Sequence, residues 1–467
     1  MNSLTDKQSG MNGSSRSSPD RDVRRQRKGR NPMRYGNTLA RTVLAAGIAS
    51  SMIFVAGCGS TADNGSTDTS SGDQKVKLTF SGWVPGIEDA VNLWNEKNPN
   101  IQIEFKRIAS DAQKNYSTQI QAGTAGDILQ LADDNLADLV IDEQVQDISQ
   151  YVNDKKDQFT DAAWNTTQLG GNTYAVPQDS SPTAFMYRKD LFEQYGVSVP
   201  KTWDEYLDAA RKLHAANPDL YITAFTPNEY SLFNSDFLQE GGSWYATEGD
   251  TWKVTIDSKA SQTVAKRYQT LLDEKLVKVV DMWTPDFWSA VNKGEIASFN
   301  YQAWFPVIIE ENAPDLSGKW AIAQSPSDSG EGPWSDSGGS LNVVTATCKY
   351  PEQASKFITW LNTDPDSLNI LISKGGLFPA AKAGFENEAM TKPSDYWGGQ
   401  VVSEEFVKAA NNVKEGAMGG PLEGTGHTAL QDEFAKVVNG EETFEDALSA
   451  TSTSLKKAIS DKGLNVK

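Results

Sequence analysis

A strand, a helix and a second strand succeed one another between residues 78 and 105, and this pattern constrains the fold more than any other feature. Leu78-Thr79-Phe80 reads as the beginning of a strand, and the amphipathic stretch 87–98 reads as a helix that Pro99 ends. Residues 101–105 alternate between apolar and polar side chains, as a half-buried strand does. Because strands joined through a helix run parallel, the pattern predicts an α/β fold with a parallel sheet.

Further elements of the same kinds follow. Asp127–Leu131 reads as a short strand, and Thr202 with Glu205 forms a capping box that opens a helix through Ala215. Apolar periodicity predicts four more helices, near residues 260–275, 352–362, 428–438 and 443–456.

The composition allows a large core without a disulfide. Of the 467 residues 38% are hydrophobic, which suffices for a sizeable core, and the length allows two or three domains or lobes. The two cysteines are Cys58 and Cys348, and Cys348 lies in a β-like apolar run where we expect a small buried side chain. With only two histidines the chain is poor in metal ligands, and we expect neither a metal nor a cofactor.

The charge of the chain disfavours nucleic acid as a partner. The formal net charge is -19, and the first 57 residues carry ten of the 43 basic residues but three of the 62 acidic ones, which leaves -26 for the remainder. A nucleic-acid-binding surface needs a basic stripe. Anionic substrates are disfavoured more weakly, because a site can be locally basic.

Residues 1–57 read as an export signal. The run 42–57 is apolar, follows Arg34 and Arg41, and is shorter than the roughly 20 residues that span a bilayer. It ends in Val55-Ala56-Gly57-Cys58, which resembles the lipobox of bacterial lipoproteins, and the resemblance implies a lipid on Cys58. The alternative is a chance occurrence of this motif in a membrane anchor.

Residues 58–75 are rich in Gly, Ser, Thr and Asp and read as a flexible tether. We therefore expect the large soluble part to be held at the outer face of the cytoplasmic membrane of a Gram-positive bacterium. The basic cluster at 21–30 precedes Met33, which we expect to be the true start of translation.

Ordered motifs from residue 126 to residue 448 resemble a known family. They are Gly126–Ile128, Leu169–Asp179, Phe185–Phe192, Pro200–Leu207, Lys293–Ala297, Tyr301–Trp304, Gly338-Gly339, Glu352–Ile358, Gly375–Pro379 and Thr443–Leu448. Their order and spacing are similar to those of extracellular solute-binding proteins of family 1, the carbohydrate-binding components of ATP-binding-cassette (ABC) importers that include maltose-binding protein. Arg188 departs from the pattern, since the family usually has Asn there, at a structural edge position.

The resemblance implies a two-lobed periplasmic-binding-protein-like fold of type II, with the ligand in the cleft between the lobes. The expected N-terminal and C-terminal lobes are, respectively, residues 76–183 with 342–378 and residues 184–341 with 379–467. The expected crossings between them lie near 181–186, 336–342 and 376–381. The resemblance further implies a monomer that closes on its ligand by a hinge motion and then docks on the membrane permease.

Several candidate ligand residues follow predicted strands, where open α/β sheets bind their ligands. Trp83 comes after the first strand, and Asp133, Asp134 and Asn135 come after the strand that ends at Leu131. Aromatic rings pack on the apolar faces of sugars, while carboxylates and amides bind their hydroxyl groups. The alternatives are a tryptophan packed on its own helix and a helix cap among the three polar residues.

The resemblance adds further candidates. Trp304 matches the family position where a ring commonly stacks on the sugar, with Tyr301 beside it, and His427 in the loop 424–427 replaces a stacking aromatic of a maltose-binding relative. Tyr230 lies in a loop that the family uses in its second lobe, although a polar loop without ligand contact is equally compatible. The remaining candidates are a loop tryptophan and three residues of family motifs, namely Trp334, Gly338, Gly339 and Phe378.

Other conspicuous residues are expected to be structural. Trp283, Phe287 and Trp288 have helical spacing, which favours the core over a site. His214 lies in an amphipathic helix.

We therefore expect a protein that is not an enzyme but captures an oligosaccharide for import. A glycoside hydrolase needs two carboxylates at a set separation, and among 62 acidic residues the sequence singles out no pair. The motifs H-E-x-x-H, G-x-S-x-G and G-x-x-x-x-G-K-[ST] do not occur in the sequence. An exported carbohydrate-active enzyme and a surface lipoprotein that adheres to polymers stay open as alternatives.

Overall fold

The computed structural model describes residues 75–109, 115–414 and 418–467. The predicted export signal, Met33, Cys58 and the tether before Lys75 lie outside these residues. Within the described ranges, no helix combines the length and the apolar character needed to cross a membrane.

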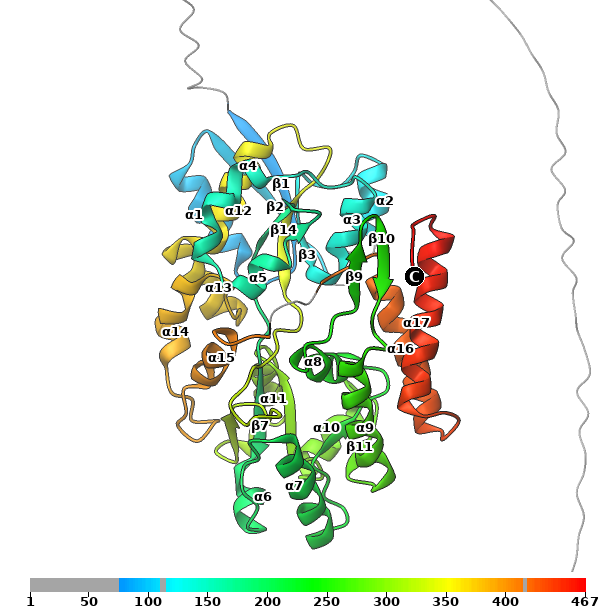
Figure 1. Ribbon diagram of the computed structural model, residues 1–467. Helices are drawn as coiled ribbons and strands as arrows, with labels where there is room; N and C mark the ends of the chain where they lie inside the picture. Colours follow the sequence, from blue (N-terminus) through cyan, green and yellow to red (C-terminus); the bar gives the residue numbers. More distant parts are fainter. Residues whose placement is uncertain (1–74, 110–114, 415–417) are drawn as a thin grey trace, which may run out of the picture. The chain divides into compact units, whose positions relative to one another are not determined.

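Five strands form the first sheet, in the order β2-β1-β3-β14-β6 (Figure 1). Their bounds are β1 Val76–Gly82, β2 Ile101–Arg107, β3 Ile128–Ala132, β6 Ala175–Pro177 and β14 Ser340–Val344. β1 runs parallel to both β2 and β3, with Phe80 opposite Phe105 and Ile128. The parallel sheet predicted from residues 78–105 is therefore confirmed, and β14, from much later in the chain, joins it antiparallel to β3 and β6.

Helices that lie far apart in the sequence pack together on this sheet. α1 (Ile87–Lys97) joins β1 to β2 and places Trp94 in the core. Trp94 packs edge-on against Phe357 of α12 (Pro351–Thr363), and α13 (Pro365–Gly375) lies beside α1. The other elements of this part are α2 Tyr116–Gln121, η2 Asp133–Asn135, α3 Leu136–Ile141, α4 Ser149–Val152, η3 Asn153–Gln158, α5 Asp161–Asn165, β4 Gln168–Leu169 and β5 Asn172–Thr173.

A second sheet has the order β12-β7-β13, with both outer strands antiparallel to β7 (Figure 1). Its strands are β7 Thr183–Arg188, β12 Ser298–Gln302 and β13 Trp320–Ala323. The parallel pair β8 (Thr223–Phe225) and β11 (Val277–Val279) lies next to β12, because Tyr221 bridges to Ile296.

One apolar cluster joins this second part to helices from the end of the chain. It takes side chains from α7 Trp203–Ala216, α9 Lys259–Asp273, α16 Glu423–Val438 and α17 Phe444–Asp461. The remaining elements are α6 Lys189–Gln194, α8 Ser231–Gln239, β9 Tyr245–Glu248, β10 Thr251–Val254, α10 Pro285–Lys293, α11 Phe305–Asn312, η4 Pro314–Leu316, η5 Lys382–Glu386, α14 Glu388–Thr391 and α15 Val402–Ala410.

The predicted helices are present, with differences of five residues at the start of α16 and at the end of α17, which runs to Asp461. Thr202 caps α7 by accepting from the backbone N–H of Glu205 at 3.2 Å, and the Glu205 carboxylate accepts from the Thr202 N–H at 3.4 Å, so the capping box is confirmed. α16 begins five residues before the expected 428, because Gly424 and Gly426, which read as a loop, are helical. A Cβ on Gly426 would lie 3.1 Å from the Trp244 ring, so the glycine allows the close packing of this turn.

Two connecting segments run side by side between the sheets. The first, residues 178–182, joins β6 to β7, and the second, residues 324–339, joins β13 to β14. Asp336 accepts hydrogen bonds from the Ser180 hydroxyl and the Ser181 N–H, and Asp179 accepts from the N–H and hydroxyl of Ser340. These segments lie close to two of the expected crossings, while the lobe boundaries themselves stay a prediction.

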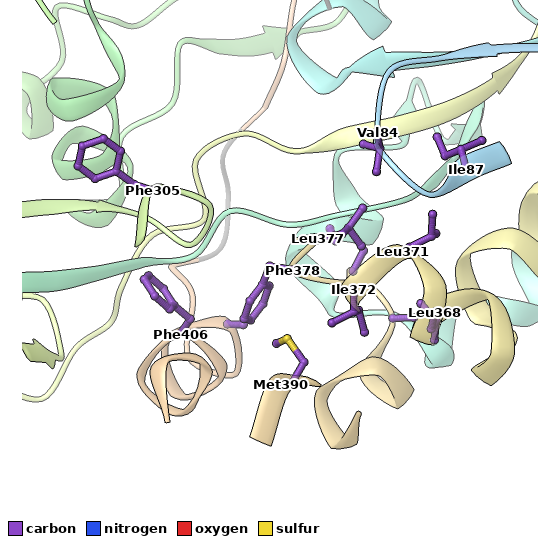
Figure 2. Close-up of a cluster of buried hydrophobic side chains, with 14 of the residues drawn as sticks. Val84, Ile87, Phe305, Leu368, Leu371, Ile372, Leu377, Phe378, Met390 and Phe406 are labelled. Atoms are coloured by element: carbon purple, nitrogen blue, oxygen red, sulfur yellow. The ribbon is translucent and has the colours of Figure 1, made fainter. Parts of the chain in front are cut away.

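Phe378 lies in the apolar core. Figure 2 shows its ring between Ile372 of α13 and Phe406 of α15, and the residue is 7% exposed. Its ring centroid is 5.5 Å from that of Phe385 and 6.3 Å from that of Phe406. The described structure thus places this predicted ligand residue among apolar side chains.

Replacing Gly339 by Ala should destabilise the protein more than replacing Gly338. Both glycines have a positive φ, 142° and 105°, at which a side chain strains the backbone by roughly 1–3 kcal/mol. A Cβ on Gly339 would also lie 2.6 Å from the Asp179 carbonyl oxygen, whereas a Cβ on Gly338 comes no closer than 4.0 Å to the Ser181 hydroxyl. Urea unfolding should show the larger loss of unfolding free energy for Gly339→Ala, and equal losses would contradict the close approach.

Candidate functional site

Two adjoining cavities lie where the strands of both sheets end. The larger has a volume of about 160 Å³ and the smaller about 60 Å³, and they share Asp133, Asn165 and Asp336. Asp133 follows β3, and Asp336 belongs to the connection between β13 and β14. The larger cavity is completed by side chains of α8 and α16 and by the residues around them, including Tyr230, Asn234, Trp244, Glu423 and His427. Both sheets therefore contribute to one site.

Three aromatic rings in contact form one wall of the larger cavity. The imidazole of His427 lies parallel to the Tyr230 ring, with 3.7 Å between centroids and 16° between planes. The Trp244 ring meets His427 edge-on at 4.8 Å. The Trp244 indole N–H donates to Asn234 at 2.8 Å, and the Asn234 amide donates to the Ser337 hydroxyl at 3.0 Å. These bonds fix the wall in a single orientation.

His427 is neutral and has free hydrogen-bonding capacity toward the cavity. It is 5% exposed, and burial lowers its pKa to about 3. Its Nδ1 is 3.6 Å from Asp134 Oδ2 and its Nε2 is 3.7 Å from Glu423 Oε1, which is beyond hydrogen-bond length. Among the described residues, Nε2 has no hydrogen-bond partner. A ligand hydroxyl can supply one.

Carboxylates dominate the polar lining. As far as the structure describes them, the two cavities are lined by one lysine, Lys414, and by five acidic residues, which are Asp133, Asp134, Asp179, Asp336 and Glu423. Burial raises the pKa of Asp134, Asp179 and Asp336 to about 6. Burial and the neighbouring charge of Asp134 hold the pKa values of Asp133 and Glu423 well above their ordinary range. Such a lining accepts hydrogen bonds and repels anions.

These carboxylates do not converge on a metal site. In residues 75–109, 115–414 and 418–467, no three His, Cys, Asp or Glu side chains are placed to hold a metal ion together. Asp179 accepts from the Ser340 hydroxyl and N–H, and Asp336 accepts from the Ser180 hydroxyl and the Ser181 N–H.

Trp304 lies beside the cavity rather than in its lining. It follows β12 directly, and its indole N–H donates to Gln302 Oε1 at 2.6 Å. The Gln302 amide in turn donates to the carbonyl oxygen of Ser337, which lines the cavity. Tyr301 is fully buried and meets the Trp304 ring edge-on at 5.3 Å, so it supports that ring.

The other two candidate tryptophans, Trp83 and Trp334, are fixed by hydrogen bonds to neighbouring parts of the chain. Trp83 is half-buried against the first core, and its backbone N–H donates to Gln130 Oε1 at 2.8 Å. Trp334 is anchored by an indole bond to the Ser325 carbonyl at 3.1 Å and by backbone pairing with Asn412, so packing orders this loop more than the sequence predicts.

The structure thus places some of the predicted ligand residues in the cavity linings and others outside them. In the described part of the chain, the cavity linings include Asp133, Asp134, Tyr230, Gly338, Gly339 and His427. The linings do not include Trp83, Asn135, Tyr301, Trp304, Trp334 or Phe378. Asn135 stays adjacent, because its amide donates to the Asp134 carboxylate.

Two expectations about structural residues have opposite outcomes. His214 is structural as predicted, with Nδ1 3.2 Å from the Leu220 carbonyl oxygen. The expectation that Trp283 lies in the core with Phe287 and Trp288 is wrong, since Trp283 is 44% exposed. α10 begins at Pro285 with Thr284 as its N-cap, so Trp283 precedes the helix and helical spacing does not apply to it.

The sequence analysis did not single out several lining residues. Asp179 lies two residues after the end of β6 and satisfies the strand-end rule that identified Asp133. Glu423 lies four residues before His427 on one helix face, a spacing that could have found it. Asp336 and Trp244 carry no comparable pattern.

Comparison with known proteins identifies relatives over most of the chain. A family model described as "Bacterial extracellular solute-binding protein" matches residues 76–366. The lactose-binding protein of Rhizobium radiobacter is 25% identical over 398 residues, which cover 80% of this chain and 88% of that protein.

Two solved structures are similar in fold and sequence. The galacto-N-biose-/lacto-N-biose I-binding protein of the ABC transporter from Bifidobacterium longum, in complex with lacto-N-biose, has a TM-score of 0.75 and 29% identity, covering 85% of this chain and all of that one. The ABC transporter associated binding protein from B. animalis subsp. lactis, in complex with β-1,6-galactobiose, has a TM-score of 0.70 and 26% identity, with 85% and 100% covered. These neighbours have the two-lobed fold that the two sheets form here.

Replacing Asp134 by Asn should stabilise the unliganded protein at neutral pH but not in acid. The pKa of Asp134 is about 6 when folded and near 3.8 when unfolded, so its stabilising contribution is complete below pH 3.8 and is lost as the pH rises through 6. The ionised carboxylate therefore costs free energy at about pH 7.5 that Asn does not. A quarter of the side chain is exposed, so we expect a gain of about 1–2 kcal/mol.

Urea unfolding of both proteins at about pH 7.5 and pH 4 measures this gain. The difference should vanish at the lower pH. A gain of the same size at both pH values would contradict the assigned role of burial.

Proposed function

The chain belongs to the family of bacterial extracellular solute-binding proteins, and on this basis we propose that it captures a neutral oligosaccharide for an ABC importer. The observation that carries the proposal is that the wall of Tyr230, His427 and Trp244 lines the same cavity as the acidic residues Asp133 and Asp134. Sugars need both surfaces, since rings cover their C–H faces and carboxylates accept from their hydroxyl groups.

The charge of the lining supports a neutral ligand. Asp134, Asp179 and Asp336 have pKa values of about 6 and are ionised at neutral pH, and they outnumber the one lysine of the described lining. Such a lining repels uronates and other acidic sugars, whereas a neutral sugar offers hydroxyl groups that can donate to it. The lactose-binding, lacto-N-biose-bound and β-1,6-galactobiose-bound relatives favour a ligand of two or more sugar units.

We propose that lobe closure accompanies capture. In this proposal, one lobe is the part of the chain around the first sheet, and the other is the part around the second sheet. The side-by-side segments 178–182 and 324–339 form the hinge. Across the opposite side of the cleft, Asp138 of α3 accepts from the Leu422 N–H at 3.2 Å and from Lys462 Nζ at 3.0 Å. These contacts form on closing, and the closed complex is what the permease recognises.

The proposed location is the outer face of the cytoplasmic membrane of a Gram-positive bacterium. A lipid on Cys58 and the segment 58–75 would keep a monomeric receptor beside its permease. Met33 as the start of translation is part of the same proposal.

Saccharide binding and its dependence on His427 test the proposed function. Lacto-N-biose, β-1,6-galactobiose, lactose and arabino-oligosaccharides form the panel, and a bound sugar should raise the thermal midpoint. His427→Ala should weaken the best ligand about tenfold or more by calorimetry, since it removes a stacked, fully desolvated ring. His214→Ala, at the other histidine, is the matched control and should leave affinity unchanged.

The same incubations separate the alternatives. Chromatography should recover the sugars intact, whereas released products would favour a glycoside hydrolase. Binding confined to insoluble polymer would favour an adhesion protein.

Replacing Cys58 by Ser should release the protein from the membrane fraction. The full chain expressed in a Gram-positive host should sediment with membranes, because a lipid attached to Cys58 would hold it in the bilayer. Cys348→Ala is the matched control, since this buried thiol faces the interior of the described structure. Equal distribution of the two variants between membrane and medium would contradict lipid anchoring. It would leave the proposal about sugar binding unaffected.

A further inference from the structure

A strained turn leads into the helix that carries two of the lining residues. Leu422 is the N-cap of α16 and has a φ of 59° and a ψ of 33°, a left-handed conformation that leucine rarely adopts. Glu423 follows it directly, and His427 lies one helical turn later. Both line the larger cavity, so the strained residue stands at the entrance to the site.

The sequence before this turn holds residues that could have avoided the strain. Gly419 and Gly420 precede it, but neither has a left-handed φ. The left-handed position falls on Leu422 instead, whose side chain packs against the apolar cluster around the second sheet. Strain of this kind persists where surrounding contacts impose it, and it is typical of ligand clamps and switch regions.

One of these contacts comes from the part of the chain around the first sheet. The Leu422 N–H donates to both carboxylate oxygens of Asp138 on α3, at 3.2 Å each. α3 packs on the strands of the first sheet through Leu136 and Leu139, whereas α16 packs in the apolar cluster around the second. The hydrogen bond therefore joins the start of α16 to the opposite lobe of the proposed closure.

The conformation of Leu422 decides where α16 begins and in which direction it runs. Its carbonyl oxygen accepts the first hydrogen bonds of the helix, from the N–H groups of Thr425 and Gly426 at 3.0 Å. The residue before it is fixed, because the Pro421 carbonyl accepts from the Tyr245 hydroxyl at 2.9 Å. A rotation of the backbone at Leu422 would therefore redirect the first turn of α16 and the carboxylate that this turn brings to the cavity.

We propose that Asp138 is a positioning residue for the sugar site, because its bond to the Leu422 N–H imposes the left-handed turn that directs Glu423 and His427 into the cavity. The inference rests on the proposed function and deepens it. The described cavity linings do not include Asp138, so it acts through α16 rather than on the ligand. When the lobes open, the bond is lost, the turn relaxes, and the two lining groups withdraw from the sugar.

The test is calorimetry with lacto-N-biose, β-1,6-galactobiose and lactose as probes. Asp138→Ala should weaken the sugar that the unaltered protein binds best about fivefold to tenfold, because it removes a carboxylate acceptor. Asp138→Asn keeps an acceptor for the Leu422 N–H and should stay within about twofold. Asp142→Ala is the matched control and should also stay within about twofold, since Asp142 pairs with Lys462 at 3.2 Å, as Asp138 does at 3.0 Å, but in the described structure only Asp138 accepts from Leu422.

The strain at Leu422 supplies a second measurement. Leu422→Gly and Leu422→Ala differ by one Cβ, but only glycine adopts a φ of 59° without strain. The Gly variant should bind about threefold more tightly than the Ala variant. Added to Asp138→Ala, Leu422→Gly should recover most of the lost affinity and Leu422→Ala should not, a difference that a merely structural role of Asp138 would not produce.

Each outcome bears on the inference. Equal affinities of Leu422→Gly and Leu422→Ala, or equal losses for Asp138→Ala and Asp142→Ala, overturn the positioning role while the proposed function stands. Absence of saccharide binding by the unaltered protein overturns both. The thermal midpoint without ligand shows whether each variant folds, and if Asp138→Ala does not, the comparison of the two Leu422 variants decides.

Discussion

The structure depends on the hydrogen bonds between two connecting segments that join its sheets. Asp336 on the second segment accepts hydrogen bonds from Ser180 and Ser181 on the first, and Asp179 on the first accepts from Ser340, the residue of β14 that directly follows the second segment. The same carboxylates line the cavities. Hence the groups that hold the segments in register are also the groups that a ligand meets. A substitution at Asp179 or Asp336 therefore affects both the register of the segments and the lining of the cavity.

The buried acidic residues of the cavity lower the stability of the unliganded protein. Burial raises the pKa of Asp134, Asp179 and Asp336 to about 6, so near neutral pH each carries a charge that is partly stripped of water. Within the described residues, the His427 Nε2 beside them has no hydrogen-bond partner. Hydroxyl groups of a sugar would donate to these acceptors, so a bound ligand would supply the hydrogen bonds that the folded protein alone does not make.

The sequence predicts most of the regular structure, because its signals are local. The strands around residues 78–105, the Thr202 cap and the helices α9, α12, α16 and α17 follow from apolar periodicity and end residues. The strand-end rule also identifies Asp133 and Asp134 correctly as lining residues. These features depend on side chains within one or two turns of each other.

What the sequence does not predict depends on distant contacts. Trp283 fails as a core residue, because its outward turn is imposed by Asn228 and Glu229, which lie more than 50 residues earlier. Asp336 has no local pattern, and its role comes from Ser180 and Ser181 on the other segment. Trp304 is adjacent to the cavity only through Gln302 and Ser337. Tertiary geometry, not residue type, decides these positions.

The contacts across the cleft bear on how the lobes could move. Lys462 pairs with Asp138 at 3.0 Å and with Asp142 at 3.2 Å, but all three side chains are between 25% and 35% exposed. Ion pairs of this exposure contribute about 1 kcal/mol or less. A closed arrangement held mainly by them would open readily. Under the proposed function, the free energy that keeps the lobes closed must then come from the ligand, because only a ligand that touches both Asp133 and His427 prefers the closed state. Weak contacts at the rim are what a receptor needs if it is to release its sugar to a permease.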